Sequence, residues 1–415
     1  MSETATRKDT PEQAEFRAYC RDWLADNHPG QPPMAMPQSA VELSDPDALE
    51  WLRQWEKSAY NAGMIGCDYP KEVGGSGRTK CQMIANQEMQ AAKTPFLPNI
   101  IGLGMAAPTV FHHGRDDVKS ELLPRLFSAD DIWCQGFSEP GAGSDLASLQ
   151  TFAKQDGDNW IINGHKVWTT LAHFADWMIL LCRTDKSDKY NGLSYFIVPI
   201  KAALGKGVTV RPLIKISGQT GFNEVLFDDL VIPDRYRLDA VGAGWKVAMT
   251  TLTHERGAGE LIMPASGGMV VEKEGGVSVG NIYALIEMAK QHKRGDKTAA
   301  DDPAIRDEMM QLLIRREALR QNTRRSAVPA LTEHPMRIPL QNKLVGSEIS
   351  QDVTEMSYRV AGPASTLYVN DPNAPSGGLW SQEYMNSFGG TIAAGTSEVQ
   401  RNILGERVLG LPKSK

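Results

Sequence analysis

Residues 134–170 hold the side chains best suited to chemistry on a bound cofactor. The stretch Ser138-Glu139-Pro140-Gly141-Ala142-Gly143-Ser144-Asp145 is a glycine-rich loop with a hydroxyl near each end. Aromatic and aliphatic runs then flank Asn163-Gly164, a dipeptide that favours a tight hairpin turn. Backbone N–H groups beside such an aromatic hairpin could hold a flat, anionic cofactor. Because Gly and Pro punctuate ordinary loops too, a surface loop without a ligand explains the same pattern.

Composition and charge exclude several classes of function. The 415 residues are 41% hydrophobic and 23% charged, which is typical of a globular protein with two or three domains. The net charge is −6 and no stripe of Lys and Arg occurs, so nucleic-acid binding is not expected. No apolar run reaches membrane-spanning length, and the first residues lack the features of a signal or transit peptide. We therefore expect no membrane insertion. The five cysteines show no metal-ligand spacing, so we also expect reduced thiols, no metal site and a cytoplasmic protein.

The order of the expected elements is helical, β, helical. Apolar residues at helical spacing over residues 16–24, a cap and proline at Asp45-Pro46, and helical texture over 81–127 predict an N-terminal helical domain, 1–130. A period of two then predicts a middle β domain, 131–237, a small barrel or sandwich. The strands are expected at 149–153, 160–162, 166–170, 177–181, 193–198, 208–210 and 224–227.

Helical spacing returns after residue 233 and predicts a C-terminal helical bundle, 238–415. Two glycine-rich segments, 267–280 and 362–378, interrupt it and are interpreted as inserted loops. The helices are expected at 246–256, 282–293, 305–325, 338–358 and 398–408.

Four motifs, in this order along the chain, resemble those of the flavin-dependent acyl-CoA dehydrogenases. The first runs from Tyr69-Pro70 to Gly77, and the second is Phe137-Ser138-Glu139-Pro140-Gly141-Ala142-Gly143-Ser144-Asp145. The third is Asn163-Gly164-His165-Lys166-Val167-Trp168-Thr169-Thr170, and the fourth is Gly395-Thr396-Ser397-Glu398 with Leu409-Gly410-Leu411-Pro412 beyond it.

The resemblance implies a mainly α fold with a central β domain: a helical N-terminal domain, a β-barrel middle domain and a C-terminal four-helix bundle. It also implies FAD as cofactor, with Ser138, Trp168 and Thr170 at the isoalloxazine ring. The residues that the resemblance assigns to FAD are Gln135, Phe137, Ser138, Gly143, Ser144, Trp168, Thr170, Arg294, Thr396 and Glu398. Those that it assigns to the substrate are Ser144, Thr253, Arg256 and Gly395.

The family reaction converts an acyl-CoA to the trans-2-enoyl-CoA, as in fatty acid β-oxidation, and passes electrons to an electron-transfer flavoprotein. A carboxylate removes the α proton. Many members carry that carboxylate just before Gly-Thr, where this chain has Ala394, which cannot accept a proton. A minority carry it on a bundle helix, and the run Glu255-Arg256 resembles that arrangement. Glu255 is therefore the predicted base, although a Glu-Arg pair is also common on solvated helices.

The resemblance implies a homodimer or homotetramer. Family members carry an Arg-x-x-Phe-Gly run whose arginine reaches a neighbouring subunit's FAD, and here only Arg294 can stand in for it. A family Gln-x-x-Gly-Gly run is replaced by Tyr358-Arg359-Val360-Ala361-Gly362. A mixed oligomer, with this chain as a silent partner subunit, therefore stays open, as does a flavin oxidase or monooxygenase on the same fold. The sequence gives neither the length nor the branching of the acyl group.

Overall fold

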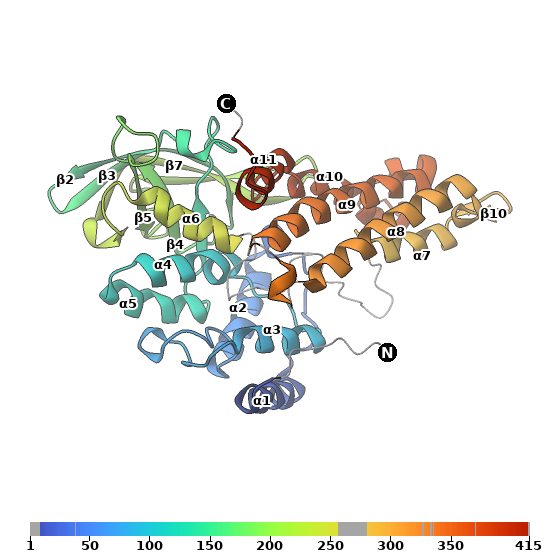
Figure 1. The fold of residues 1–415 in the computed structure, drawn as a ribbon, viewed down its shortest axis with the longest axis horizontal. Coiled ribbons are helices and arrows are strands. Elements are labelled where there is room, and N and C mark those ends of the chain that lie inside the picture. Colours follow the sequence, from blue (N-terminus) through green and yellow to red (C-terminus); the bar gives the residue numbers. More distant parts are fainter. Residues whose placement is uncertain are drawn as a thin grey trace. The chain divides into compact units, whose positions relative to one another are not determined.

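The computed structural model describes residues 9–37, 39–255, 280–325, 328–332, 334, 336–369 and 371–413. The chain divides into two compact units, Met1–Gly267 and Gly268–Lys415. The first unit carries helices α1 to α6 and the main sheet, and the second carries helices α7 to α11 (Figure 1). The predicted fold class, mainly α with a central β domain, is confirmed. The domain boundaries at residues 130 and 237 stay a prediction.

The helices of the first unit begin where the sequence supplies caps. Thr10 forms a capping box with Gln13 at the start of α1, and Asp45 accepts from the Asp47 N–H at the start of α2. The predicted apolar face of α1 is buried at Phe16 and Cys20. The helices are α1 (Pro11–Asn27), α2 (Pro46–Asn61), α3 (Gln82–Ala91), α4 (Ala107–His113), α5 (Asp116–Phe127) and α6 (Gly244–Glu255).

An eight-stranded sheet forms the β part of the first unit. Its order is β6-β7-β3-β2-β4-β5-β8, and β1 pairs in parallel with β4 off this path. β4 and β5 are mostly apolar and almost wholly buried, with Arg183 and Ser194 as their polar residues, as expected for strands covered on both faces. The strands are β1 (Trp133–Gly136), β2 (Phe152–Asp156), β3 (Asn159–Thr170), β4 (Trp177–Arg183), β5 (Leu193–Val198), β6 (Val208–Ile214), β7 (Thr220–Pro233) and β8 (Arg237–Leu238).

The predicted hairpin at Asn163-Gly164 is wrong. β3 runs without a turn from Asn159 to Thr170, and the chain reverses earlier, between β2 and β3. The dipeptide instead marks a bulge, at which the register of β3 against β7 shifts. Gly164 is needed there because a Cβ would lie 2.3 Å from the Thr151 hydroxyl oxygen. Asn163 donates across the bulge to Asp229 at 2.8 Å.

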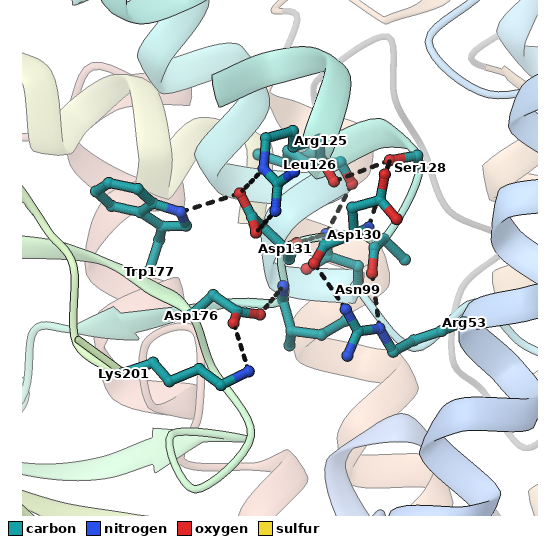
Figure 2. Close-up of polar contacts among 12 residues, drawn as sticks. Arg53, Asn99, Arg125, Leu126, Ser128, Asp130, Asp131, Asp176, Trp177 and Lys201 are labelled. Carbon is teal, nitrogen blue, oxygen red and sulfur yellow. Dashed lines mark hydrogen bonds and ion pairs between the residues drawn. The ribbon is translucent and has the colours of Figure 1, made fainter. Parts of the chain in front are cut away.

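A polar network fixes the segment that leads from α5 into β1 (Figure 2). Asn99 donates to the carbonyls of Leu126 and Asp131 and accepts from the Trp133 N–H, so it spans the whole connection. Arg125 and Trp177 both bond the Asp131 carboxylate. Because these polar groups form hydrogen bonds with one another, they hold the start of β1 in a single position relative to α5.

The second unit is built on long antiparallel helices. In Figure 1, α7, α8 and α9 lie side by side, and the described core joins their apolar faces. Segment 362–378, predicted as a loop, holds two short 3₁₀ turns, and segment 267–279 lies outside the described residues. The elements are α7 (Ile282–Gln291), β9 (Lys293–Arg294), β10 (Lys297–Thr298), α8 (Pro303–Arg324), α9 (Arg337–Ala361), α10 (Leu379–Gly390) and α11 (Ser397–Ile403).

All five cysteines are unpaired and buried. Within the described ranges, no group of three or more His, Cys, Asp or Glu side chains is placed to hold a metal ion. None of the helices in the described part of the chain is long and apolar enough to cross a bilayer.

Candidate functional site

The glycine-rich loop leaves β1 and folds back on itself. Glu139 and Ala142 exchange two backbone hydrogen bonds of 3.0 Å, which close a tight turn around Pro140 and Gly141. The Ser138 carbonyl accepts from the Val167 N–H at 2.9 Å, so the loop lies directly against β3. Gly143 and Ser144 stay open: Ser144 is exposed, and a Cβ on Gly143 would meet nothing within 4 Å. The far end of the loop can therefore admit a ligand.

A buried ion pair holds this loop in place. The Lys166 ammonium lies 2.9 Å from the Glu139 carboxylate and also donates to the Phe137 carbonyl at 3.0 Å. The carboxylate accepts the N–H groups of Gln150 and Thr151 as well. Burial alone raises the pKa of Glu139, but the Lys166 charge and the three hydrogen bonds donated to the carboxylate outweigh it and lower that pKa. The carboxylate is thus held in its charged form.

Trp168 stands out from the sheet in a strained conformation. Its φ is 59°, in the left-handed region that costs a bulky residue about 1–2 kcal/mol. It lies inside a second bulge of β3, between the paired residues Lys166 and Thr169, and its indole is 60% exposed. Its ring meets Phe222 edge-on at 6.1 Å. A strained backbone that exposes an indole is a common mark of a binding surface.

The residues around this bulge suit the FAD that the resemblance implies. The exposed indole offers a flat apolar face, and Thr170 is only partly buried two residues further along β3. Beside them, Thr169 Oγ1 and Asn223 Oδ1 are buried without a hydrogen-bond partner among the described residues. A polar rim around an exposed aromatic face fits an aromatic ring that carries polar edges.

Glu255 is the last residue of α6, and a short chain of contacts joins that helix to the loop. The Phe137 ring is buried and packs edge-on against Tyr195 of β5 at 5.7 Å. The Tyr195 hydroxyl lies 2.9 Å from the hydroxyl of Thr251, one helical turn before Glu255. Burial raises the pKa of Tyr195, and the negative charge of Glu255 raises it further. The predicted base therefore lies within electrostatic reach of a ring that packs on the loop.

Four of the predicted residues lie in the second unit. Thr396 caps α11 by accepting the Val399 N–H at 3.3 Å, and Glu398 is exposed in the first turn. The Gly395 carbonyl accepts from Lys343 at 2.6 Å. The Arg294 guanidinium donates to the carbonyls of Arg359 and Val360 at the end of α9. Arg294 is thus engaged within its own chain.

The remaining predicted residues are Gln135, Phe137, Thr253 and Arg256. Gln135 lies on β1, opposite Ile179, and is partly exposed. Thr253 donates to the Met249 carbonyl of its own helix at 2.8 Å. Because the Phe137 ring points into the core, only its backbone can face a ligand. Arg256 lies outside the described residues.

The first unit carries three of the predicted residues on different elements: Ser138 on the loop, Trp168 on β3 and Glu255 on α6. The sequence interpretation missed the residues that hold them, which are Lys166 and Tyr195. A lysine in a strand of otherwise apolar inward positions could have indicated the buried pair. Nothing in the sequence marks Tyr195 as more than a strand residue.

Comparison with protein families matches nearly the whole chain. Residues 10–130 match the acyl-CoA dehydrogenase N-terminal domain, residues 134–230 the middle domain and residues 242–409 the C-terminal domain. Among curated proteins, the chain is 37% identical to acyl-CoA dehydrogenase IpdE1 of Mycobacterium tuberculosis, over 96% of this chain and 98% of that protein. It is 30% identical to acyl-CoA dehydrogenase FadE26 of the same organism, over 98% of each chain.

Two solved structures are similar over their full lengths. One is a Tcur3481-Tcur3483 steroid ACAD, with a TM-score of 0.75 and 27% identity over 98% of this chain and 99% of that chain. The other is the ChsE4-ChsE5 complex from Mycobacterium tuberculosis, with a TM-score of 0.72 and 26% identity over 99% and 100%.

Proposed function

We propose a function for this chain from one premise: it belongs to the acyl-CoA dehydrogenase family. It is an acyl-CoA dehydrogenase, a flavoprotein with FAD as cofactor. We infer that it introduces a trans α,β double bond into an acyl-CoA and that an electron-transfer flavoprotein collects the electrons. When bound, FAD supplies the acceptor for the hydride that leaves the β carbon.

The observation that carries the proposal is the contact chain from Phe137 through Tyr195 to the helix that ends at Glu255. Through it, the helix that ends in a carboxylate is joined to Phe137, the residue directly before the glycine-rich loop. In the proposed reaction Glu255 takes the α proton, since Ala394 has no group that can accept one. Ser138 and Trp168 orient the ring system, and Lys166 with Glu139 keeps the loop in position.

For the acyl group, we propose a bulky, ring-bearing chain of the steroid type. Support comes from the solved steroid ACAD, which is 27% identical over 98% of this chain. We propose a cytoplasmic homo-oligomer as the working state. The competing role, a silent subunit in a mixed oligomer, is favoured by the alanine at position 394 and by the similarity to the ChsE4-ChsE5 complex.

Anaerobic flavin reduction tests the proposal. The purified yellow protein is mixed with a panel of short, long, branched and steroid-side-chain acyl-CoAs, and loss of visible flavin absorbance is followed. We expect bleaching by at least one thioester and fastest bleaching by a ring-bearing one. Bleaching only after a second chain is added would establish the partner-subunit role. No bleaching in either case would contradict dehydrogenation, and oxygen consumption with the same thioester would indicate an oxidase.

A further inference from the structure

The hydroxyl of Thr251 is the meeting point of three elements. It is fully buried, and its oxygen lies 2.8 Å from Thr109 Oγ1 on α4 and 2.9 Å from the Tyr195 hydroxyl on β5. Thr109 and Tyr195 are themselves fully buried. Three hydroxyls therefore satisfy one another inside the core of the first unit, where an unmade hydrogen bond is costly.

Neighbouring carbonyls indicate which of these hydroxyls donates and which accepts. Thr109 donates its single proton to the Met105 carbonyl at 2.7 Å, so it can only accept from Thr251. Thr251 can donate its proton to Thr109 at 2.8 Å or to the Val247 carbonyl of its own helix at 3.4 Å. In either case the Tyr195 hydroxyl donates to Thr251. Of the three residues, Thr251 is the one whose loss interrupts both links between the hydroxyls.

Other contacts hold the same helix to the same neighbours. His113, one turn after Thr109 on α4, lies 2.9 Å from the Thr250 hydroxyl. At the other end of α6, Gly244 lies so close to β5 that a Cβ would come within 2.6 Å of the Ser194 backbone. α6 is thus fixed at its start by close packing and near its end by hydroxyl contacts. Glu255 follows Thr251 by four residues, which is about one turn of the helix.

We propose that Thr251 is a positioning residue for Glu255: its bridge to Thr109 and Tyr195 fixes the last turn of α6 relative to the loop that packs on Tyr195. This inference rests on the proposed function, in which Glu255 is the base. Phe137 packs on the same Tyr195 ring, so one side chain touches both the loop and the bridge. In this proposal the bridge sets the separation between the Glu255 carboxylate and the start of the glycine-rich loop at Phe137.

Three threonine variants of the holoprotein test this inference. Thr251→Val keeps the shape and removes the hydroxyl, whereas Thr251→Ser keeps the hydroxyl. Thr354→Val is the matched control, because Thr354 is equally buried but donates only to carbonyls of its own helix, α9. Two quantities are measured: the limiting rate of anaerobic flavin reduction with its half-saturating acyl-CoA concentration, and amide hydrogen exchange over residues 247–255.

We expect Thr251→Val to lower the limiting rate about 10- to 100-fold, the usual cost of a misplaced catalytic group. The half-saturating concentration should stay within about threefold, and exchange over 247–255 should rise. Thr251→Ser and Thr354→Val should stay within about threefold of the parent rate. Tyr195→Phe, which removes only the first donor, should change rate and exchange in the same direction as Thr251→Val.

An unchanged rate and unchanged exchange in Thr251→Val would overturn the inference, as would an equal loss in Thr251→Ser. If Thr251→Val fails to fold, Tyr195→Phe tests the inference instead: an unchanged reduction rate and unchanged exchange over residues 247–255 in that variant would overturn it. If no acyl-CoA reduces the parent flavin, the proposed function fails. The exchange comparison then still decides whether Thr251 holds the last turn of α6.

Discussion

Lys166 and Glu139 form an ion pair of 2.9 Å in which the lysine side chain is wholly buried. The pair joins β3 to the turn between β1 and β2, and the ammonium also holds the Phe137 carbonyl. The glycine-rich loop is therefore fixed by an ion pair between its own Glu139 and Lys166 on a neighbouring strand. A loop that is held in this way can bare its backbone to a ligand without losing its shape.

Removing one partner of this pair should destabilise the protein strongly. Glu139→Gln or Lys166→Met leaves a buried charge without its partner, which costs about 3–5 kcal/mol. For the first unit we expect a fall in Tm of about 6–20 °C. Differential scanning calorimetry of the FAD-loaded variants measures it.

The matched control is Lys290→Met, which breaks a pair of 2.6 Å with Glu287 whose side chains are 57% and 60% exposed. Exposed pairs contribute little, so its Tm should stay near that of the parent. Equal shifts in Lys166→Met and Lys290→Met would show that the buried pair does not hold the loop.

The contribution of Glu139 should disappear in acid. Its pKa in the folded protein lies below the ordinary value of 4.5, so its stabilisation is present above that value and is lost as the pH falls through the lowered pKa. The Tm gap between the parent and Glu139→Gln should therefore narrow from about pH 6 to about pH 3. A gap that stays constant over this range would mean that the carboxylate is not charged in the folded state.

Glu255→Gln should abolish flavin reduction while FAD stays bound, because an amide cannot accept the α proton. We expect a fall of about 10²–10⁴-fold in the anaerobic reduction rate, with an unchanged visible flavin spectrum. Glu348→Gln, on α9, is a suitable control, since Glu348 forms an ion pair of 2.6 Å with Arg401. A parent-like rate in Glu255→Gln would exclude Glu255 as the base.

Trp168 should matter for FAD affinity and little for the stability of the apoprotein. Its indole is 60% exposed, and its left-handed backbone is strained, so Trp168→Gly relieves strain and removes the flat face. We expect weaker FAD binding in a titration of the apoprotein and an apoprotein Tm at or slightly above that of the parent. Trp168→Phe should bind FAD more tightly than Trp168→Gly. Equal affinity of the parent and Trp168→Gly would contradict a stacking role.

Much of the fold could be predicted from local signals. The cap at Asp45 and the apolar periods predicted the helices and most strands, because these depend on neighbours in sequence. The dipeptide Asn163-Gly164 misled for a physical reason. Its flexibility serves a bulge beside Thr151, a contact between segments that only the folded sheet brings together.

The residues of the candidate site also fall into those that local sequence could predict and those that it could not. Ser138 and Trp168 lie in motifs, so the sequence could name them, and the structure adds the left-handed backbone that exposes the indole. The partners of these residues could not be predicted, because Tyr195 meets Thr251 across 56 residues of sequence. Such contacts carry no local pattern. They follow from the packing of α6 on β5.

Ala394 keeps a left-handed backbone, with φ of 55°, although its side chain has nothing to offer to the reaction. The buried Gln400 amide donates to its carbonyl at 2.7 Å, and Lys343 donates to the next carbonyl. The shape of this turn is thus maintained by helices α9 and α11 and not by the residue at its tip. A side chain at the tip that does not hold the turn can be replaced without a change in the backbone around it. The fold of this turn and the presence of a proton acceptor on it are therefore independent properties of the chain.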